Sequence, residues 1–327
     1  MCNTTFGRNL QKFSAILFGS WKNELLSIAT GSTYEAVSIS QVANMRCILP
    51  PIEEQKQIAR FLDRETTRID TLITKKRELI DLLQKKQDAI IYEVVTQGLN
   101  PDTSFRYGGI EWLDKIPAHW KSVRLKIIAE SIQTDPFGRQ LHFDDYSSGG
   151  IPVINPSHLY NGKIFADPDV AVDQKTWDRL SRHELLEGDI VFARRGELGR
   201  CGLVTSEEVG WLCGTGSMRV RLYKDWVLPA FIIQALSING AAEQLILESV
   251  GSTMDNLNTK VLGDLLLPLP PINEQKTIVS YLQERNEYFQ SLLEKTQASI
   301  DEMRHYRSSL ITAAVTGKID VCEEAKL

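Results

Sequence analysis

The sequence lacks the features that define several large classes of protein. Its 327 residues include five cysteines, and no two of them have the spacing of a zinc site or of a disulfide framework. Lysine and arginine number 37 against 42 aspartates and glutamates, so the chain has no bulk positive charge that would by itself indicate binding to a polyanion. Any contact with nucleic acid must therefore be local.

Long hydrophobic runs are also missing. The longest apolar stretch, residues 227–238, is interrupted by Pro229 and Gln234 and is too short to cross a bilayer. The apolar patch at residues 13–18 is followed by charged residues instead of the small residues of a leader cleavage site. We therefore expect a cytoplasmic protein with no membrane partner and with about two domains' worth of chain.

The sequence repeats itself at an offset of 220 residues. Gly-Ser-Thr at 31–33 recurs at 251–253, and Leu-Pro-Pro-Ile at 49–52 recurs at 269–272. Between residues 31 and 98, nineteen positions are identical to their shifted counterparts, where chance would give roughly four. Duplication is the simplest explanation.

A long helix is expected in each copy, at 49–98 and at 269–318. Each Leu-Pro-Pro is followed by more than 40 residues without proline or glycine. The apolar residues form one narrow stripe, and the other faces carry balanced charges. A rod about 65 Å long with one narrow seam is hardly stable alone. We therefore expect the two helices to pair as an antiparallel coiled coil; the alternative is two ordinary core helices. The residues expected to pair them are Ile58, Leu62, Ile69, Leu72, Leu83 and Ile90 in the first helix and Ile278, Leu282, Phe289, Leu292, Met303 and Leu310 in the second.

The region between the helices, residues 99–268, has a different texture. Short runs of β-forming residues are separated by glycine and aspartate, and two helical stretches follow them. The expected strands are at 151–154, 189–193, 202–205 and 217–223, and the expected helices are near 228–237 and 241–248. The fold class is therefore α+β, with a mixed, largely antiparallel domain carried between two long helices.

Arginines crowd one turn of this domain. Arg194, Arg195 and Arg200 lie among glycines in a turn after a buried-looking strand, and guanidinium groups on such a loop can grip phosphates or read guanine edges. The alternative is a solvated hairpin with an internal ion pair to Glu197. Further candidates for DNA contact are Arg219 and Arg221, which share a face of one strand, together with Lys163, Asn155 and Ser157.

Taken together, these motifs resemble a known family. The segment Gly-Ile-Glu-Trp-Leu-Asp-Lys-Ile-Pro-Ala-His-Trp at 109–120 is similar to the opening of a target-recognition domain in the specificity subunits of type I restriction-modification enzymes. Segments 186–191 and 196–200 resemble its central strand and loop, and segments 251–253, 269–276 and 314–320 resemble its end and the helix behind it. The resemblance covers nearly the whole chain. The order of the motifs, combined with the duplication, is more specific than any single motif.

The resemblance implies a non-catalytic subunit that binds double-stranded DNA and needs no cofactor or metal. Recognition domains of this kind each read half of a bipartite site, and the paired helices separate them and dock type I methyltransferase (modification) subunits. A restriction/translocase subunit joins through the complex. A stiff separator agrees with this function, because it fixes the number of helical turns between the half-sites.

One departure from the family pattern concerns the first copy. Only 48 residues precede the first helix, and they align with the last part of the complete domain. We expect residues 1–48 to be the remnant of a first recognition domain and residues 319–327 to be a tail. Such a chain would read one half-site, paired with a second copy of itself or with another fragment. An inactive gene remnant is the alternative.

Three other classes of function fit the sequence less well. A magnesium-dependent nuclease would use Asp169, Asp173 and Lys175, but only three residues separate the two aspartates, too few to place them on separate strands. The histidines have no ligand or triad spacing, and residues 155–158 break the active-site pattern of an adenine methyltransferase. A purely structural coiled-coil adaptor would explain the helical seams but not the domain between them.

Overall fold

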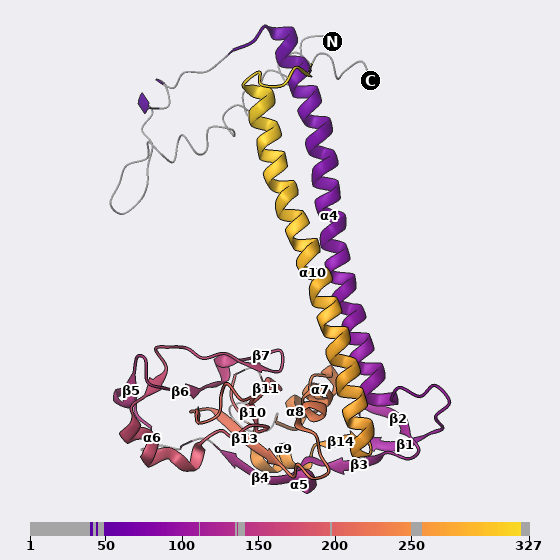
Figure 1. The fold of residues 1–327 in the computed structure, drawn as a ribbon, viewed down its shortest axis with the longest axis vertical. Helices are drawn as coiled ribbons and strands as arrows, with labels where there is room; N and C mark the ends of the chain where they lie inside the picture. Colours follow the sequence, from indigo (N-terminus) through magenta and orange to yellow (C-terminus); the bar gives the residue numbers. More distant parts are fainter. Residues whose placement is uncertain are drawn as a thin grey trace. The chain divides into compact units, whose positions relative to one another are not determined.

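The computed structural model falls into two compact units, and each is described here by itself. One unit comprises the chain up to Gln84 and from Phe289 onward, and the other is Lys85–Tyr288. Each unit holds part of two long helices, α4 (Ile52–Gln97) and α10 (Ile272–Val315) (Figure 1). The residues that the structure describes are 40–41, 44, 49–110, 112–134, 136, 141–196, 198–249 and 257–321.

Both long helices have clear start and stop signals. Each begins directly after two prolines, which lack the N–H donor that the first turn of a helix does not need. Each ends just before a glycine in the left-handed conformation, Gly98 with φ 77° and Gly317 with φ 71°. The bodies between these signals contain no residue that would break a helix.

A buried glutamine fixes the start of each long helix. The side-chain Nε2 of Gln275 donates to the carbonyls of Pro270 (2.9 Å) and Trp226 (3.2 Å), and its Oε1 accepts from the N–H of Leu228 (2.7 Å). Gln55, its counterpart in the first copy, donates to the carbonyl of the equivalent proline at 2.7 Å. The sequence Glu-Gln-Lys, which occurs at 54–56 and again at 274–276, therefore has a structural role, and in the second copy its glutamine also binds the segment 226–228 to the helix.

In the first unit, the two helices pair in antiparallel fashion. Near the start of α4, Ile58 and Leu62 pack with Ala314 and Val315 from the end of α10. Further along, Ile69 and Ile73 pack with Ile300, and Met303 and Leu310 lie partly buried against them. An ion pair of 3.0 Å between Arg307 and Asp70 crosses the seam. The predicted antiparallel pairing and the α+β fold class are confirmed.

The seam differs from the expected one at Leu72. Its side chain is 42% exposed, whereas that of Ile73 is 6% exposed. Because one turn holds 3.6 residues, a step of three from Ile69 falls about 60° to one side and a step of four about 40° to the other. The seam follows the second step, through Ile73 to the half-buried Ile80. The remaining expected residues of this unit are buried (Phe289) or half-buried (Leu83 and Leu292).

The second unit contains a central antiparallel sheet and a smaller mixed one. The central sheet has the order β11 (Cys201–Leu203), β10 (Ile190–Ala193), β13 (Ser217–Leu222) and β4 (Ala129–Thr134). The second has the order β12 (Leu212–Cys213), β6 (Ile151–Ile154), β9 (Ala171–Val172) and β5 (Tyr146–Ser147), with β12 parallel to β6. Three ladders complete the strands: β1 (Phe105–Ile110) with β2 (Leu113–Pro117), β3 (Lys121–Arg124) with β14 (Leu266–Leu269), and β7 (Leu159–Tyr160) with β8 (Lys163–Ile164).

Short helices cover these sheets. The α-helices are α5 (Leu125–Ile128), α6 (Gln174–Leu180), α7 (Pro229–Leu236), α8 (Asn239–Ser249) and α9 (Thr259–Asp264). Three 3-10 turns, η2 (Phe143–Asp145), η3 (Pro156–His158) and η4 (Ser181–His183), lie in the connections. Helix α7 is the most apolar of the α-helices, and most of its side chains are buried. No single helix of the described chain is long and apolar enough to cross a membrane; α7 and α8 reach that length and hydropathy only together, with a bend of 72° between them.

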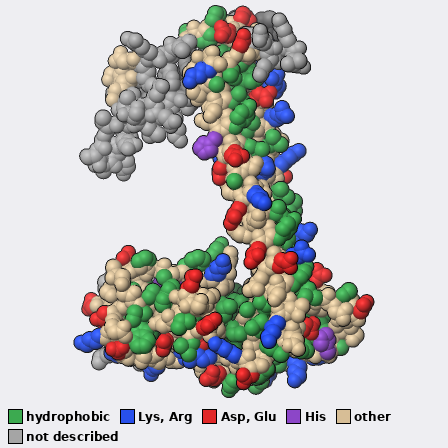
Figure 2. Space-filling model, in the orientation of Figure 1, with side chains coloured by type: hydrophobic (Ala, Val, Ile, Leu, Met, Phe, Trp, Pro, Cys, Tyr) green, Lys and Arg blue, Asp and Glu red, His purple; other side chains and the backbone are tan. Residues whose placement is uncertain are grey.

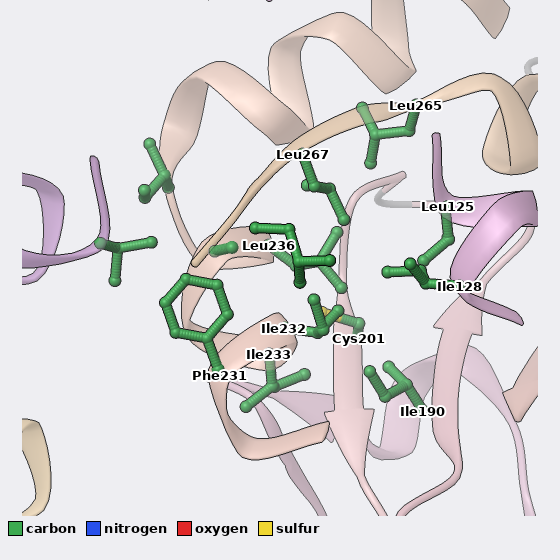
Figure 3. Packing of buried hydrophobic residues seen from close by; sticks show 14 of the residues in the cluster. Leu125, Ile128, Ile190, Cys201, Phe231, Ile232, Ile233, Leu236, Leu265 and Leu267 are labelled. Atoms are coloured by element: carbon green, nitrogen blue, oxygen red, sulfur yellow. The ribbon is translucent and has the colours of Figure 1, made fainter. Parts of the chain in front are cut away.

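One hydrophobic core joins this domain to the segments of both long helices that belong to the same unit. Figure 3 shows Ile232 of α7 between Phe231 of the same helix on one side and Ile190 of β10 and Ile128 of α5 on the other, all in one cluster. The same core includes Val94 and Val95 of α4 and Ile278 and Leu282 of α10, with Ile90 partly buried against it. Cys201 is buried there, and its burial raises the pKa of the thiol to about 12. Because these parts share one core, the domain cannot move away from the adjoining helix segments without exposing it.

Replacing Ile73 with alanine should lower the free energy of unfolding by about 2–4 kcal/mol, because it removes buried methyl groups and leaves a cavity in the seam. Leu72→Ala, one position away on the same helix, should change it by less than about 0.5 kcal/mol. Urea denaturation followed by helical circular dichroism measures both. Equal losses in the two variants would contradict the assigned seam.

Candidate nucleic-acid interface

Three loops of the second unit meet at one end of its sheets. Strands β6 and β12 are parallel, so their carboxyl ends, Ile154 and Cys213, lie side by side. Strand β10 ends at Ala193, which pairs with Ser217 at the start of β13. The loops that leave these ends come together, and we call their described residues the three-loop cluster: residues 155–157, 194–196 with 198–200, and 214–216.

Backbone hydrogen bonds tie the three-loop cluster together. The loop at 214–216 lies between the other two and is called the middle loop. The N–H of Gly214 donates to the carbonyl of Ile154 at 2.9 Å, which links the middle loop to the residue that precedes the loop at 155–157. The N–H of Arg194 donates to the carbonyl of Gly216 at 2.8 Å, and the carbonyl of Arg194 accepts from the N–H of Leu257 at 3.0 Å. Three connections distant in sequence are thus held as one platform.

Glycine is required at two places in the middle loop. A Cβ on Gly214 would lie 2.3 Å from Oδ1 of Asn155 and 2.5 Å from Cγ1 of Val153, far inside contact distance. Gly216 has a φ of 80°, in the left-handed region that other residues rarely adopt. The Gly-Thr-Gly sequence of this loop is therefore a steric requirement of the close approach between loops.

Arg194 and Arg195, adjacent in the predicted turn, have opposite surroundings. Arg194 is 8% exposed, and its Nε donates to the carbonyl of Leu257 at 3.2 Å. Arg195 is exposed and precedes Gly196, whose φ is 77°. Arg200 is half-buried. Glu197, the acidic partner considered from the sequence, lies outside the described residues.

The other polar candidates lie in or beside the cluster. Ser157 is exposed and Asn155 is half-buried in the first loop. Lys163 is exposed on the β7–β8 hairpin, which is bound to β11 by a hydrogen bond from the N–H of Leu203 to the carbonyl of Gly162 (3.0 Å). Thr215, at the centre of the loop at 214–216, is also exposed, and it was not among the residues predicted from the sequence. Its only signal in the sequence is the pair of flanking glycines between two strands.

Arg219 and Arg221 do share a face of β13, but that face is covered. Asp189, 1% exposed, accepts two hydrogen bonds from Arg221, at 2.8 and 2.7 Å. Arg219, 6% exposed, donates to the carbonyl of Glu184 and to Oε1 of Gln133, both at 2.6 Å. These contacts hold the segment before β10 against the central sheet.

The two guanidiniums differ in burial: Arg219 is 6% exposed, whereas the side chain of Arg221 is 21% exposed. The hydrogen bonds to Asp189 raise the pKa of Arg221, whereas burial lowers the pKa of Arg219. A charge removed from water is tolerated when it is paired and hydrogen-bonded, and both the buried Arg219 and the half-buried Arg221 have such partners. We therefore leave Arg219 and Arg221 out of the candidate interface.

The aspartates of the nuclease alternative serve local structure. Asp173 caps helix α6 by accepting a hydrogen bond from the N–H of Thr176 at 2.8 Å, which lowers the pKa of its carboxyl group. Asp169 accepts from the hydroxyl of Ser148 at 2.9 Å. Among the residues placed by the structure, no group of three His, Cys, Asp or Glu side chains could hold a metal ion.

The assignment of Asp189 as the buried partner of Arg221 is testable by stability. Asp189→Asn should lower the free energy of unfolding by about 3–5 kcal/mol, because it leaves a guanidinium without its counter-charge in the interior. Glu187→Gln, an exposed site on the same segment, is the matched control and should stay within about 0.5 kcal/mol. Thermal unfolding of both variants measures this; a stable Asp189→Asn protein would show that the pair is dispensable.

A cluster of hydrogen-bonded polar loops on a domain joined to two long helices is the kind of surface that a recognition protein presents to a partner. Comparison with known proteins identifies the family of this chain. The family of the type I restriction modification DNA specificity domain matches residues 3–82 and 117–302, and the chain belongs to this family.

Curated relatives agree with this family. The chain is 24% identical to the type I restriction enzyme MjaVIII specificity subunit of Methanocaldococcus jannaschii, over 85% of this chain and 63% of the relative. It is 23% identical to the type I restriction enzyme EcoKI specificity subunit of Escherichia coli, over 91% of this chain and 63% of the relative. The chain thus spans less than two thirds of the length of these relatives. Their names describe specificity subunits, in agreement with the non-catalytic function expected from the sequence.

Solved structures share the fold. A chain from a study of complex assembly and conformational transition of the type I R-M system gives a TM-score of 0.68 at 19% identity, covering 96% of this chain and 71% of that one. The HsdS subunit of Thermoanaerobacter tengcongensis gives a TM-score of 0.55 at 19% identity, covering 94% and 70%. The arrangement of a recognition domain and two long helices is therefore a property of this fold.

Proposed function

We propose that this chain confers DNA sequence specificity on a type I restriction-modification complex, and that residues 99–268 read one half of a bipartite site on double-stranded DNA. The observation that carries the proposal is the three-loop cluster. It presents Arg195, Ser157 and Thr215 from three loops that backbone hydrogen bonds hold together. Arginine and hydroxyl side chains are suited to base edges and phosphates.

The overall charge of the chain agrees with a shared DNA grip. A net charge of −5 supplies little non-specific attraction to DNA, so partner subunits would provide much of the contact to the phosphates. Specificity requires only local contacts, and these are available in the cluster. A second copy of this chain, or another fragment, would supply the reading of a second half-site.

The complex formed with its methyltransferase subunit should bind DNA in a sequence-dependent and salt-sensitive way. Fluorescence polarisation with duplexes chosen from the methylated motif of the host genome measures this. The motif itself should be a bipartite or palindromic adenine-methylation site that disappears when the gene is deleted. No sequence preference even at low salt would instead favour a structural adaptor. Light scattering of the same complex shows whether one or two copies are present.

We further propose that an outer face of α4 docks a methyltransferase subunit. Leu72, Leu79 and Leu82 are 42%, 45% and 62% exposed, unusually open for leucine on a paired helix. With Arg68 and Lys75 they follow spacings of four, three, four and three, so all five lie on one face. Figure 2 shows hydrophobic, basic and acidic side chains interspersed along the paired helices.

The leucine face of α4 is more basic than the helix as a whole. Asp63, Asp70 and Asp81 lie about half a turn away from the leucine face, so the overall balance of acid and base conceals a face that is apolar and basic. The complementary partner is an amphipathic helix with acidic flanks. The restriction/translocase subunit would join through the methyltransferase subunits.

Leu79→Glu should weaken binding of the methyltransferase subunit at least about tenfold, equivalent to about 1.4 kcal/mol, because it places a charge in an apolar contact. Thr74→Glu adds the same charge on the opposite face of α4 and is the matched control. Isothermal titration calorimetry measures the affinities, and melting temperatures should be unchanged because both sites are exposed. Equal binding by the two variants would place the docking surface elsewhere.

A further inference from the structure

We propose that Arg195 reads a guanine in the half-site, that Ser157 and Thr215 hold the adjoining phosphates, and that Arg194 is a positioning residue that never touches DNA. This division of labour rests on the proposed function and deepens it. It is not visible in the sequence, where Arg194 and Arg195 are equivalent members of one arginine-rich turn.

The two arginines point to different surroundings. At the end of a strand, neighbouring side chains project to opposite sides. Arg194 is 8% exposed and donates from Nε to the carbonyl of Leu257, so its guanidinium links the turn to the chain that enters α9. Arg195 is exposed, and its guanidinium forms no hydrogen bond or ion pair with another residue that the structure describes. Its donors are available to a ligand in a way that those of Arg194 are not.

The backbone under Arg195 is fixed on both sides. On one side, both the N–H and the carbonyl of Arg194 are hydrogen-bonded, to Gly216 and Leu257. On the other side, Gly196 turns the chain in the left-handed conformation, and its carbonyl accepts from the N–H of Leu198 at 3.0 Å. Discrimination between bases requires a donor fork placed with little freedom, and a rigid backbone lowers the entropy lost when the side chain is ordered. This placement favours reading a base edge over a general grip on phosphate.

The neighbouring loops provide the complementary contacts. Thr215 and Ser157 are exposed on the two other loops of the cluster, and the middle loop is bonded to both of its neighbours. Hydroxyl groups bind phosphate oxygens with little sequence preference and fix the orientation of the protein on the duplex. Arginine offers two parallel donors that match O6 and N7 of guanine. The cluster thus combines one reader with two orienting groups.

The test uses the full chain in complex with its methyltransferase subunit, on a panel of duplexes that differ from the methylated site at one base pair each. Arg195→Ala should weaken binding to the cognate site about 10- to 100-fold and should equalise affinities at one G·C position. Arg195→Lys should restore charge but not this discrimination, because an ammonium cannot form the bidentate contact. Arg124→Ala, an exposed arginine on β3 outside the cluster, is the control and should retain the full preference.

The accompanying residues give a separate readout. Thr215→Val and Ser157→Ala should weaken all duplexes of the panel severalfold and alike. Arg194→Ala should lower the melting temperature and reduce binding without changing which base pair is preferred. Arg195→Ala should leave the melting temperature unchanged, so lost folding cannot explain its effect.

Two results would overturn the inference. One is an Arg195→Ala complex that keeps every base preference. The other is an Arg195→Lys complex that recovers the full base preference, while the salt dependence of DNA binding by the Arg195→Ala complex falls by the amount expected for one lost phosphate contact. That combination would make Arg195 a phosphate contact. If the unmodified complex shows no sequence preference, the proposed function fails instead. The two failures are therefore distinguishable.

Discussion

The narrowness of the apolar seam on α4 and α10 is the constraint on which the rest of the structure depends. A helix of this length with one thin hydrophobic stripe gains too little from its own backbone to persist alone, so the two copies must pair. Because the seam is narrow, most of the surface of each helix takes no part in the contact between them. One face of α4 can then carry exposed leucines and basic residues without weakening the pair. In the second unit, the paired segments end in the core of the recognition domain, which Ile278, Leu282 and the hydrogen bonds of Gln275 fix to α10.

The domain uses arginine in two physically distinct ways. Arg219 is buried and Arg221 is half-buried, and their hydrogen bonds to Glu184, Gln133 and Asp189 hold one segment against the sheet. Arg195 stands on a loop with its donors outward. Nothing about the residue type separates these uses. The difference lies in whether an acceptor has been brought within hydrogen-bond distance by another part of the fold.

Much of the fold could be predicted from local signals. The prolines and glycines that bound the long helices act on their immediate neighbours, and the strands at 151–154 and 217–223 have the β-forming composition expected of them. The candidate site was harder. Thr215 carries no chemical signal of its own, and it became a candidate only because Gly214 and Gly216 pack its loop between two others. Leu72 and Ile73 are both apolar, and choosing between them required the direction in which the partner helix lies.

The sequence by itself determined the duplication, the two long helices, the α+β character of the region between them and the resemblance to specificity subunits. These follow from repeats, periodicity and chain breakers, which operate over short distances or by direct comparison. Only the tertiary structure decided which arginines face the interior, which residue lies in the helical seam and which three loops form one surface. Burial and hydrogen-bond partners are set by residues distant in sequence, and no local pattern contains that information.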